Sequence, residues 1–273
     1  MDLNANYEII TFSIGDTKAG TKMGKMQIRN LSDNSTLNCV LWEEAINRID
    51  EKKFRTGNII KLKSATFNEK FNNCNVVSFD LVEEAKLGVP EDVREKMFAD
   101  LISEIEKFKD EKIRDFVKNL LTQNAELFKI MPAAKAMHHN YLGGLLVHTT
   151  ECYEFAKMLY PKLKNINEDE LYAACILHDL GKIYEYSINT ETGAIEYNDK
   201  FKKDWITHSQ YGFTICMSNG FDKIAKMIAA HHGRADWGAL IDLNEKDLEP
   251  FYYIVHHIDD LSAKFGKINV KDI

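Results

Sequence analysis

Histidine is missing from the first half of this sequence, and several other features are scarce. All nine histidines lie between His138 and His257. The chain has only four prolines and no uninterrupted apolar run near the roughly 20 residues that a membrane-spanning helix needs. Because 45% of the residues are hydrophobic and 28% are charged, this composition excludes a collagen-like or disordered chain. It predicts a globular protein without membrane spans.

Cysteine is sparse and scattered along the chain. The five cysteines form an odd number and no CxxC pair, and they are Cys39, Cys74, Cys152, Cys175 and Cys216. The sequence does not open with a basic segment followed by a short apolar segment, which is the pattern of a secretory signal. We therefore expect free thiols, a reducing environment and a cytoplasmic location.

Positive charge is too scarce for a protein that coats nucleic acid through its overall field. The formal net charge is −7, so any contact with a polyanion must be local. Residues 1–85 carry 11 Lys plus Arg against 12 Asp plus Glu. This region is therefore the less acidic part of the chain and the better candidate for such a contact.

The first 85 residues have the pattern of a small β-barrel. Five runs of strand-forming residues are separated by turn signals, at 7–14, 25–30, 36–42, 58–67 and 75–82. A short helical pattern follows the third run, and Asn72-Asn73 marks a hairpin turn between the last two runs. Five strands with one helix in this place predict an OB-type barrel, and the same strand count also fits other small β-barrels.

After Gly88 the pattern becomes helical, with Pro90 at the first helical position. We expect an α+β protein of several domains: a five-stranded OB-type barrel over residues 1–85, a helical linker region over 86–130, and an all-α bundle over 131–273. The bundle is expected to have helices near 141–160, 168–180, 208–218, 221–232 and 248–265. A small hairpin or loop over 184–198 interrupts these helices.

The helix near 168–180 ends on an inward histidine and a carboxylate. Asn167 is a candidate cap for its start, and Gly181 is expected to end it in a left-handed conformation. The apolar stripe of the helix leads to His178, which Asp179 follows. A carboxylate buried at the negative end of a helix dipole costs several kcal/mol without a compensating cation. Something positive should therefore lie beside Asp179.

Other helices repeat this arrangement and place imidazole or carboxylate groups toward one interior. On the last helix the apolar stripe turns Asp259 inward and Asp260 outward, and Thr207 is a candidate cap for a further helix. The inward set comprises His148, His178, Asp179, His208, His231, His232 and Asp259. Histidine and aspartate without a thiolate favour divalent metals of borderline or hard character, and this number of ligands suits two ions.

These residues and the motifs around them resemble a known family. The motif PAAKxxHHxYxGGLLxHT covers residues 132–149, and ILHDLGK covers residues 176–182. Together with the later HHG and Asp259, they resemble the HD-domain metal-dependent phosphohydrolase superfamily. With an OB-like barrel in front, nearly the whole chain resembles the YhaM-type 3′-to-5′ exoribonucleases.

The resemblance implies a metal centre with two divalent ions. One ion would be held by His148, His178, Asp179 and Asp259. Asp179 would bridge to a second ion held by His208 and by one of the pair His231 and His232, of which His231 is favoured. The family suggests manganese, and iron, nickel, cobalt and magnesium stay open.

The chemistry of phosphodiester hydrolysis suggests further roles for residues around the metals. Lys182, His138 and His139 would act with Asp179 in catalysis, by clamping a phosphate oxygen or protonating the leaving oxygen. Substrate contacts are expected from Lys135, His232, Arg234 and Phe71. Residues 234–240 depart from the Gly-Ser-Pro run that the family usually has here, and Ser262 replaces a common acid. These departures bear on substrate preference.

We expect a 3′-to-5′ exonuclease that hydrolyses single-stranded RNA or DNA through a metal-activated water. One alternative is a phosphohydrolase of mononucleotides or cyclic nucleotides. A non-catalytic protein that binds nucleic acid and carries a vestigial site is the other. No membrane partner is expected, and assembly into a homo-oligomer stays open.

Overall fold

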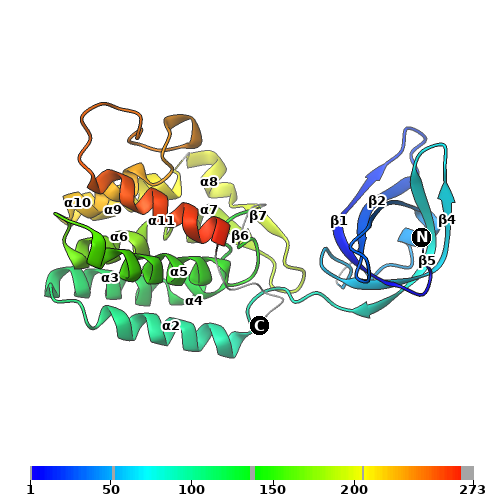
Figure 1. Ribbon diagram of the computed structural model, residues 1–273, viewed down its shortest axis with the longest axis horizontal. Coiled ribbons are helices and arrows are strands. Elements are labelled where there is room, and N and C mark those ends of the chain that lie inside the picture. Colours follow the sequence, from blue (N-terminus) through cyan, green and yellow to red (C-terminus); the bar gives the residue numbers. More distant parts are fainter. Residues whose placement is uncertain (1, 51–52, 136–138, 205, 266–273) are drawn as a thin grey trace. The chain divides into compact units, whose positions relative to one another are not determined.

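A computed structural model describes residues 2–50, 53–135, 139–204 and 206–265 (Figure 1). The chain divides into two compact units, Met1–Lys86 and Leu87–Ile273. In these described ranges, no helix combines the length and the hydropathy that crossing a membrane requires. His138, for which a catalytic role is expected, lies outside the described residues.

The first unit is a closed five-stranded barrel (Figure 1). Its strands are β1 (Asn6–Asp16), β2 (Lys22–Asn30), β3 (Thr36–Trp42), β4 (Ile59–Asn68) and β5 (Asn73–Glu83), and their order around the barrel is β1-β2-β3-β5-β4. Helix α1 (Glu43–Ile46) joins β3 to β4. The expected OB-type barrel is confirmed, and each predicted strand lies within three residues of the observed bounds.

The alternation of side chains along the strands explains why this segment closes into a barrel. On β2, Met26 and Ile28 are buried inside the barrel while Lys25 is exposed. The parallel pairing of β3 with β5 places Cys39 opposite Cys74, and both side chains are buried in the core. Phe71, at the β4–β5 hairpin beside the positive-φ residue Asn72, remains 65% exposed.

The second unit is a helical bundle with one small hairpin. Its helices are α2 (Glu91–Ile105), α3 (Glu111–Gln123), α4 (Ala125–Ile130), α5 (Gly144–Leu159), α6 (Glu168–Leu177), α7 (Lys182–Glu185), α8 (Asp199–Asp204), α9 (His208–Ser218), α10 (Asp222–Ala230) and α11 (Phe251–Phe265). Helices α5, α6, α10 and α11 pack on one another, and α9 packs on α10 (Figure 1). The hairpin of β6 (Tyr186–Ile188) and β7 (Ile195–Tyr197) occupies the predicted interruption.

Two local predictions for the second unit are corrected by the structure. Helix α6 ends at Leu177, and Gly181 has a right-handed φ of −60° rather than a left-handed one. Position 181 requires glycine because of close packing and not because of its backbone conformation. A Cβ at this position would lie 2.5 Å from the Cα of His208. Helix α8 was not predicted, because its six residues are too few to show a helical period.

Helix α9 has a complete capping box at its start. The hydroxyl of Thr207 accepts a hydrogen bond from the backbone N–H of Gln210 at 3.2 Å, and the Gln210 side chain accepts one from the N–H of Thr207 at 2.9 Å. The expected cap at Thr207 is therefore confirmed. The cap fixes the backbone immediately before His208.

We predict that Thr207→Ala lowers the free energy of unfolding by about 0.5 to 2 kcal/mol, because a backbone N–H at the helix start loses its acceptor. Thr207→Ser keeps a hydroxyl and should retain most of this stability. Chemical denaturation followed by circular dichroism measures both variants, and equal stabilities for alanine and serine would contradict the role of the cap.

Candidate metal centre

Asp179 lies at the centre of a cluster of four histidines. It lies two residues after the end of α6 and is 1% exposed. Its Oδ2 atom lies 3.3 Å from Nε2 of His148 and 3.5 Å from Nε2 of His178. Its Oδ1 atom lies 3.4 Å from Nε2 of His208 and 3.7 Å from Nε2 of His231. The two oxygens of one buried carboxylate thus face two pairs of imidazoles.

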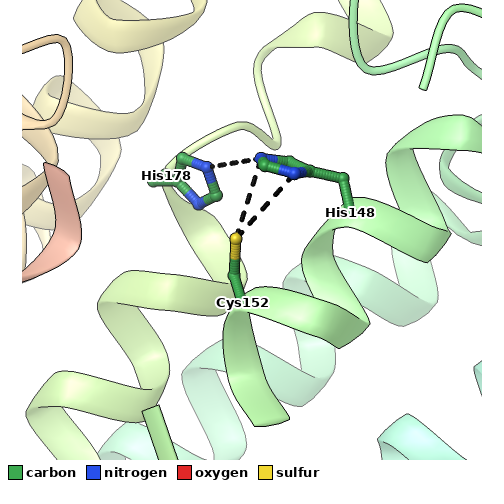
Figure 2. Close-up of side chains that lie close together, drawn as sticks. All are labelled: His148, Cys152 and His178. Carbon is green, nitrogen blue, oxygen red and sulfur yellow. Dashed lines mark hydrogen bonds between the residues drawn. The ribbon is translucent and has the colours of Figure 1, made fainter. Parts of the chain in front are cut away.

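On the Oδ2 side, residues from three helical segments meet. His148 on α5 and His178 after α6 bring their Nε2 atoms within 3.2 Å of each other, and both rings are fully buried (Figure 2). Oδ1 of Asp259 on α11 lies 3.2 Å from Nε2 of His148. Asp260, the next residue, is exposed. The predicted inward orientation of Asp259 is confirmed.

Two of the histidines are oriented by the helices that they terminate. Nδ1 of His178 donates to the carbonyl of Cys175 at 2.8 Å, and Nδ1 of His231 donates to the carbonyl of Ile228 at 2.6 Å. A carbonyl can only accept, so the proton of the neutral ring lies on Nδ1. In both rings Nε2 therefore presents a lone pair toward Asp179.

The other two histidines are oriented by buried carboxylates. Nδ1 of His208 donates to Glu185. The hydroxyl of Ser262 donates to Oε2 of Glu151 at 2.7 Å, so its oxygen accepts from Nδ1 of His148 at 2.9 Å. Histidines that bind a metal typically have their second ring nitrogen oriented by a carboxylate in this way.

The centre has the electrostatics of a cation site. Burial alone would lower the pKa of His148, but the carboxylates of Asp179 and Asp259 outweigh it and raise this pKa well above its usual range. Oδ1 of Asp179 and Nε2 of His231 are buried and make no hydrogen bond with a described residue. Because the cluster favours positive charge and keeps buried acceptor atoms without donors, its residues fit a divalent metal.

Cys152, one helical turn after His148, is a neighbour that the sequence reasoning missed. Its Sγ atom lies 3.9 Å from Nδ1 and 3.7 Å from Nε2 of His148 (Figure 2). Since these distances are nearly equal, Sγ lies away from the lone-pair direction of Nε2, where a metal would bind. Burial also raises the pKa of the thiol. A neutral thiol in this place borders the ligand set without joining it.

His231 and His232 differ in how firmly their rings are held. His231 has the fixed Nδ1 described above, and His256 donates to its backbone carbonyl at 2.7 Å. Nε2 of His232 lies 3.0 Å from Nε2 of His208, and its buried Nδ1 has no hydrogen-bond partner in the described ranges. Burial, together with the neighbouring His208, lowers the pKa of His232 to about 4. His232 is therefore neutral at pH 7.

Two further expected residues lie beside the cluster. Nζ of Lys182 is 2.6 Å from Oδ2 of Asp179, and this carboxylate outweighs the effect of burial and raises the pKa of Lys182. Nε2 of His139 lies 3.1 Å from Oε2 of Glu151. His139 therefore contacts the carboxylate behind Ser262 and not Asp179 itself.

Three expected substrate contacts lie elsewhere. Lys135 is exposed, with its Nζ 5.1 Å from the ring centre of Tyr197. Arg234 pairs with Asp236 at 2.8 Å, and Phe71 belongs to the barrel unit. Neither Lys135 nor Arg234 makes a hydrogen bond or ion pair with the described histidines of the cluster. Their roles as substrate contacts stay predictions.

Ser262 provides a test of the hydrogen-bond chain behind His148. We predict that Ser262→Ala weakens the binding of Mn²⁺ by about 10- to 100-fold, because His148 loses the acceptor that fixes its Nδ1 proton. Ser218→Ala is the matched control, since that hydroxyl bonds only to carbonyls of its own helix. Calorimetric titration of both variants measures the effect, and equal affinities would contradict it.

His232 gives a prediction for pH. Its pKa in the folded state, about 4, is below the ordinary value near 6.5. The neutral ring therefore contributes stability above pH 6.5 that is lost as the pH falls toward 4. NMR titration of the metal-free protein should show this ring titrating near pH 4, and His232→Gln should make unfolding less dependent on pH over this range. A midpoint near 6.5 would contradict the expected burial effect.

Comparisons with known proteins agree with this geometry. Residues 145–264 match the family model of the HD domain, and residues 87–168 match a model described as "Putative helicase". The chain is 30% identical over 190 residues to the 3′-5′ exoribonuclease YhaM of Geobacillus sp. (strain WCH70). The aligned region covers 64% of this chain and 54% of that protein. The chain thus spans about half the length of this curated relative. No solved structure matches this chain.

The HD-domain match contains His148, His178, Asp179, His208, His231 and Asp259, the residues whose side chains surround the candidate metal centre. The resemblance predicted from the motifs is therefore confirmed. The helical unit of this chain matches the HD-domain model over residues 145–264, and the chain is similar to a YhaM 3′-5′ exoribonuclease.

Proposed function

We propose that this protein is a metal-dependent exonuclease that removes nucleotides from the 3′ end of single-stranded RNA. One observation carries the proposal: the Nε2 atoms of four buried histidines surround the two oxygens of Asp179. The similarity to a protein named as a 3′-5′ exoribonuclease supports the direction of cleavage and the RNA substrate. The OB-type barrel supports a single-stranded polymer as substrate.

In this proposal the cluster holds two divalent ions. His148, His178, Asp179 and Asp259 hold one ion, and Asp179 with His208 and His231 holds the other. The hydrogen bonds that tie Nδ1 of His231 and His208 support the choice of these two rings. Ligands of nitrogen and oxygen without sulfur agree with manganese as the ion. When bound, such ions lower the pKa of a water molecule and neutralise charge on a phosphate.

The residues around the ligands have separate tasks in the reaction. Lys182 carries a positive charge into a site where it is only 11% exposed, so it attracts a non-bridging oxygen of the phosphate. His232 stays neutral at pH 7 and offers a hydrogen bond rather than a charge to the substrate. Glu151, through Ser262, holds His148 in one tautomer while the substrate is exchanged.

The barrel, over residues 1–85, holds the strand. Phe67 is 47% exposed and Phe71 is 65% exposed, and both lie at the end of the β4–β5 hairpin. Nζ of Lys70 lies 5.5 Å from the ring centre of Phe71. Exposed rings beside cations are the usual stacking platform for unpaired bases. This arrangement supports Phe71 as a contact for single-stranded RNA.

A neighbouring pair of carboxylates tests the metal centre. We predict that Asp259→Ala loses bound metal and lowers turnover by at least about 100-fold, because a charged ligand is removed. Asp260→Ala is the matched control on the same helix, since Asp260 is exposed and pairs only with Lys264. Metal analysis and cleavage of labelled RNA measure both variants. Full metal content and activity in Asp259→Ala would refute the ligand assignment.

The substrate is tested with a panel of single-stranded RNA, single-stranded DNA and cyclic nucleotides, each assayed with manganese, iron, nickel, cobalt and magnesium. We expect RNA labelled at its 5′ end to shorten stepwise and to release nucleoside monophosphates. Hydrolysis confined to cyclic nucleotides would favour a small-molecule phosphohydrolase instead. Binding of RNA without hydrolysis in every metal would indicate a vestigial centre.

A further inference from the structure

The loop after His232 is firmly built although it has little regular structure. The backbone N–H groups of Leu240 and Ile241 both donate to the carbonyl of Ala229, at 2.8 and 3.1 Å. The N–H of Leu243 donates to the carbonyl of Gly233 at 2.8 Å, closing the loop on itself. These bonds fix the loop to the end of α10, the helix that delivers His231.

Trp237 is the most exposed large apolar side chain of this loop. It ends a short 3₁₀ turn over 235–237 and is 62% exposed. The guanidinium of Arg234 lies 5.0 Å from the centre of its ring. Arg234 is itself held by two hydrogen bonds of 2.8 Å to the carboxylate of Asp236. The indole is therefore braced in place while most of its surface stays accessible.

The backbone beside Trp237 lies against the histidine cluster. Gly238 has a φ of +99°, and a Cβ at this residue would lie 3.1 Å from Nδ1 of His232. His232 in turn lies 3.0 Å from His208. The exposed indole of Trp237 is thus attached one residue before Gly238, whose backbone packs on His232. A ligand held between this loop and the centre would have an aromatic surface within reach.

We propose that Trp237 stacks on the nucleobase of the terminal nucleotide while its phosphodiester lies at the metal centre. This inference rests on the proposed function and names the part of the substrate that the loop recognises. Arg234 supports the indole from one side. Its guanidinium is paired with Asp236, so its positive charge is already balanced without a substrate phosphate. Since every base offers a π face, such a platform accepts all four nucleotides.

Two RNA substrates that differ only in the terminal base test the proposal. Trp237→Ala should lower kcat/KM for a strand ending in adenosine by about five- to hundredfold. It should leave the rate on a strand ending in an abasic ribose nearly unchanged, and Trp237→Phe should keep most of the preference for the base. Met158→Ala, which removes another exposed apolar side chain of the helical unit, is the control. An equal loss on both substrates would overturn the proposal.

A binding measurement keeps the inference separate from the proposed function. The chain has three tryptophans, so the double variant Trp42→Phe, Trp205→Phe leaves Trp237 as the reporter. Adenosine 5′-monophosphate should quench its fluorescence, and ribose 5-phosphate should not. Quenching by neither compound would overturn the stacking role even if RNA is cleaved. Quenching by adenosine 5′-monophosphate without cleavage of any RNA would refute the proposed function and leave the nucleotide platform standing.

Discussion

The helical unit is organised around one buried negative charge. Asp179 is almost fully enclosed and lies just beyond the C-terminal end of α6, where the helix dipole disfavours an anion. A carboxylate in such a place is stable only when positive charge faces it. The ammonium of Lys182 and the imidazole of His148, both with a raised pKa, supply that positive charge in the protein itself. The convergence of several helix ends on Asp179 follows from this requirement.

The four imidazoles are oriented by two different means, and position in the helix decides which. His178 and His231 directly follow helices, so each ring reaches the carbonyl of the residue three positions earlier, in the last turn of its helix. His148 lies within α5, where the preceding carbonyls are bonded in the helix, and His208 is the first residue of α9, so no turn of its own helix precedes it. Their Nδ1 atoms depend on groups distant in sequence, through Ser262 and Glu185. Two of the Nδ1 atoms therefore bond to groups close in sequence, and the other two bond to groups brought near by tertiary packing.

This difference explains how far the sequence predicts the structure. The local period placed Asp259 inward and Asp260 outward, and alternation located all five strands of the barrel. Glu185 carries no such signal, because its partner is 23 residues away and only the packing of α7 on α9 joins them. Gly181 was misread for the same reason, since its requirement comes from the backbone of His208. Short sequence patterns predict which side chains are buried. Contacts between helices determine which groups those buried side chains touch.

The proposed ligands of the metal centre leave the substrate open, because any phosphoester could approach the proposed pair of cations. Discrimination must come from groups that touch the rest of the substrate. His232 is neutral and therefore tolerates a neutral sugar edge as well as a phosphate. The loop after it adds an exposed indole on a backbone fixed to α10. Because the same helix end carries both His231 and this loop, a shift of α10 would move a proposed metal ligand and the proposed recognition surface together. In this proposal, reactivity and selectivity are coupled through one short segment of the chain.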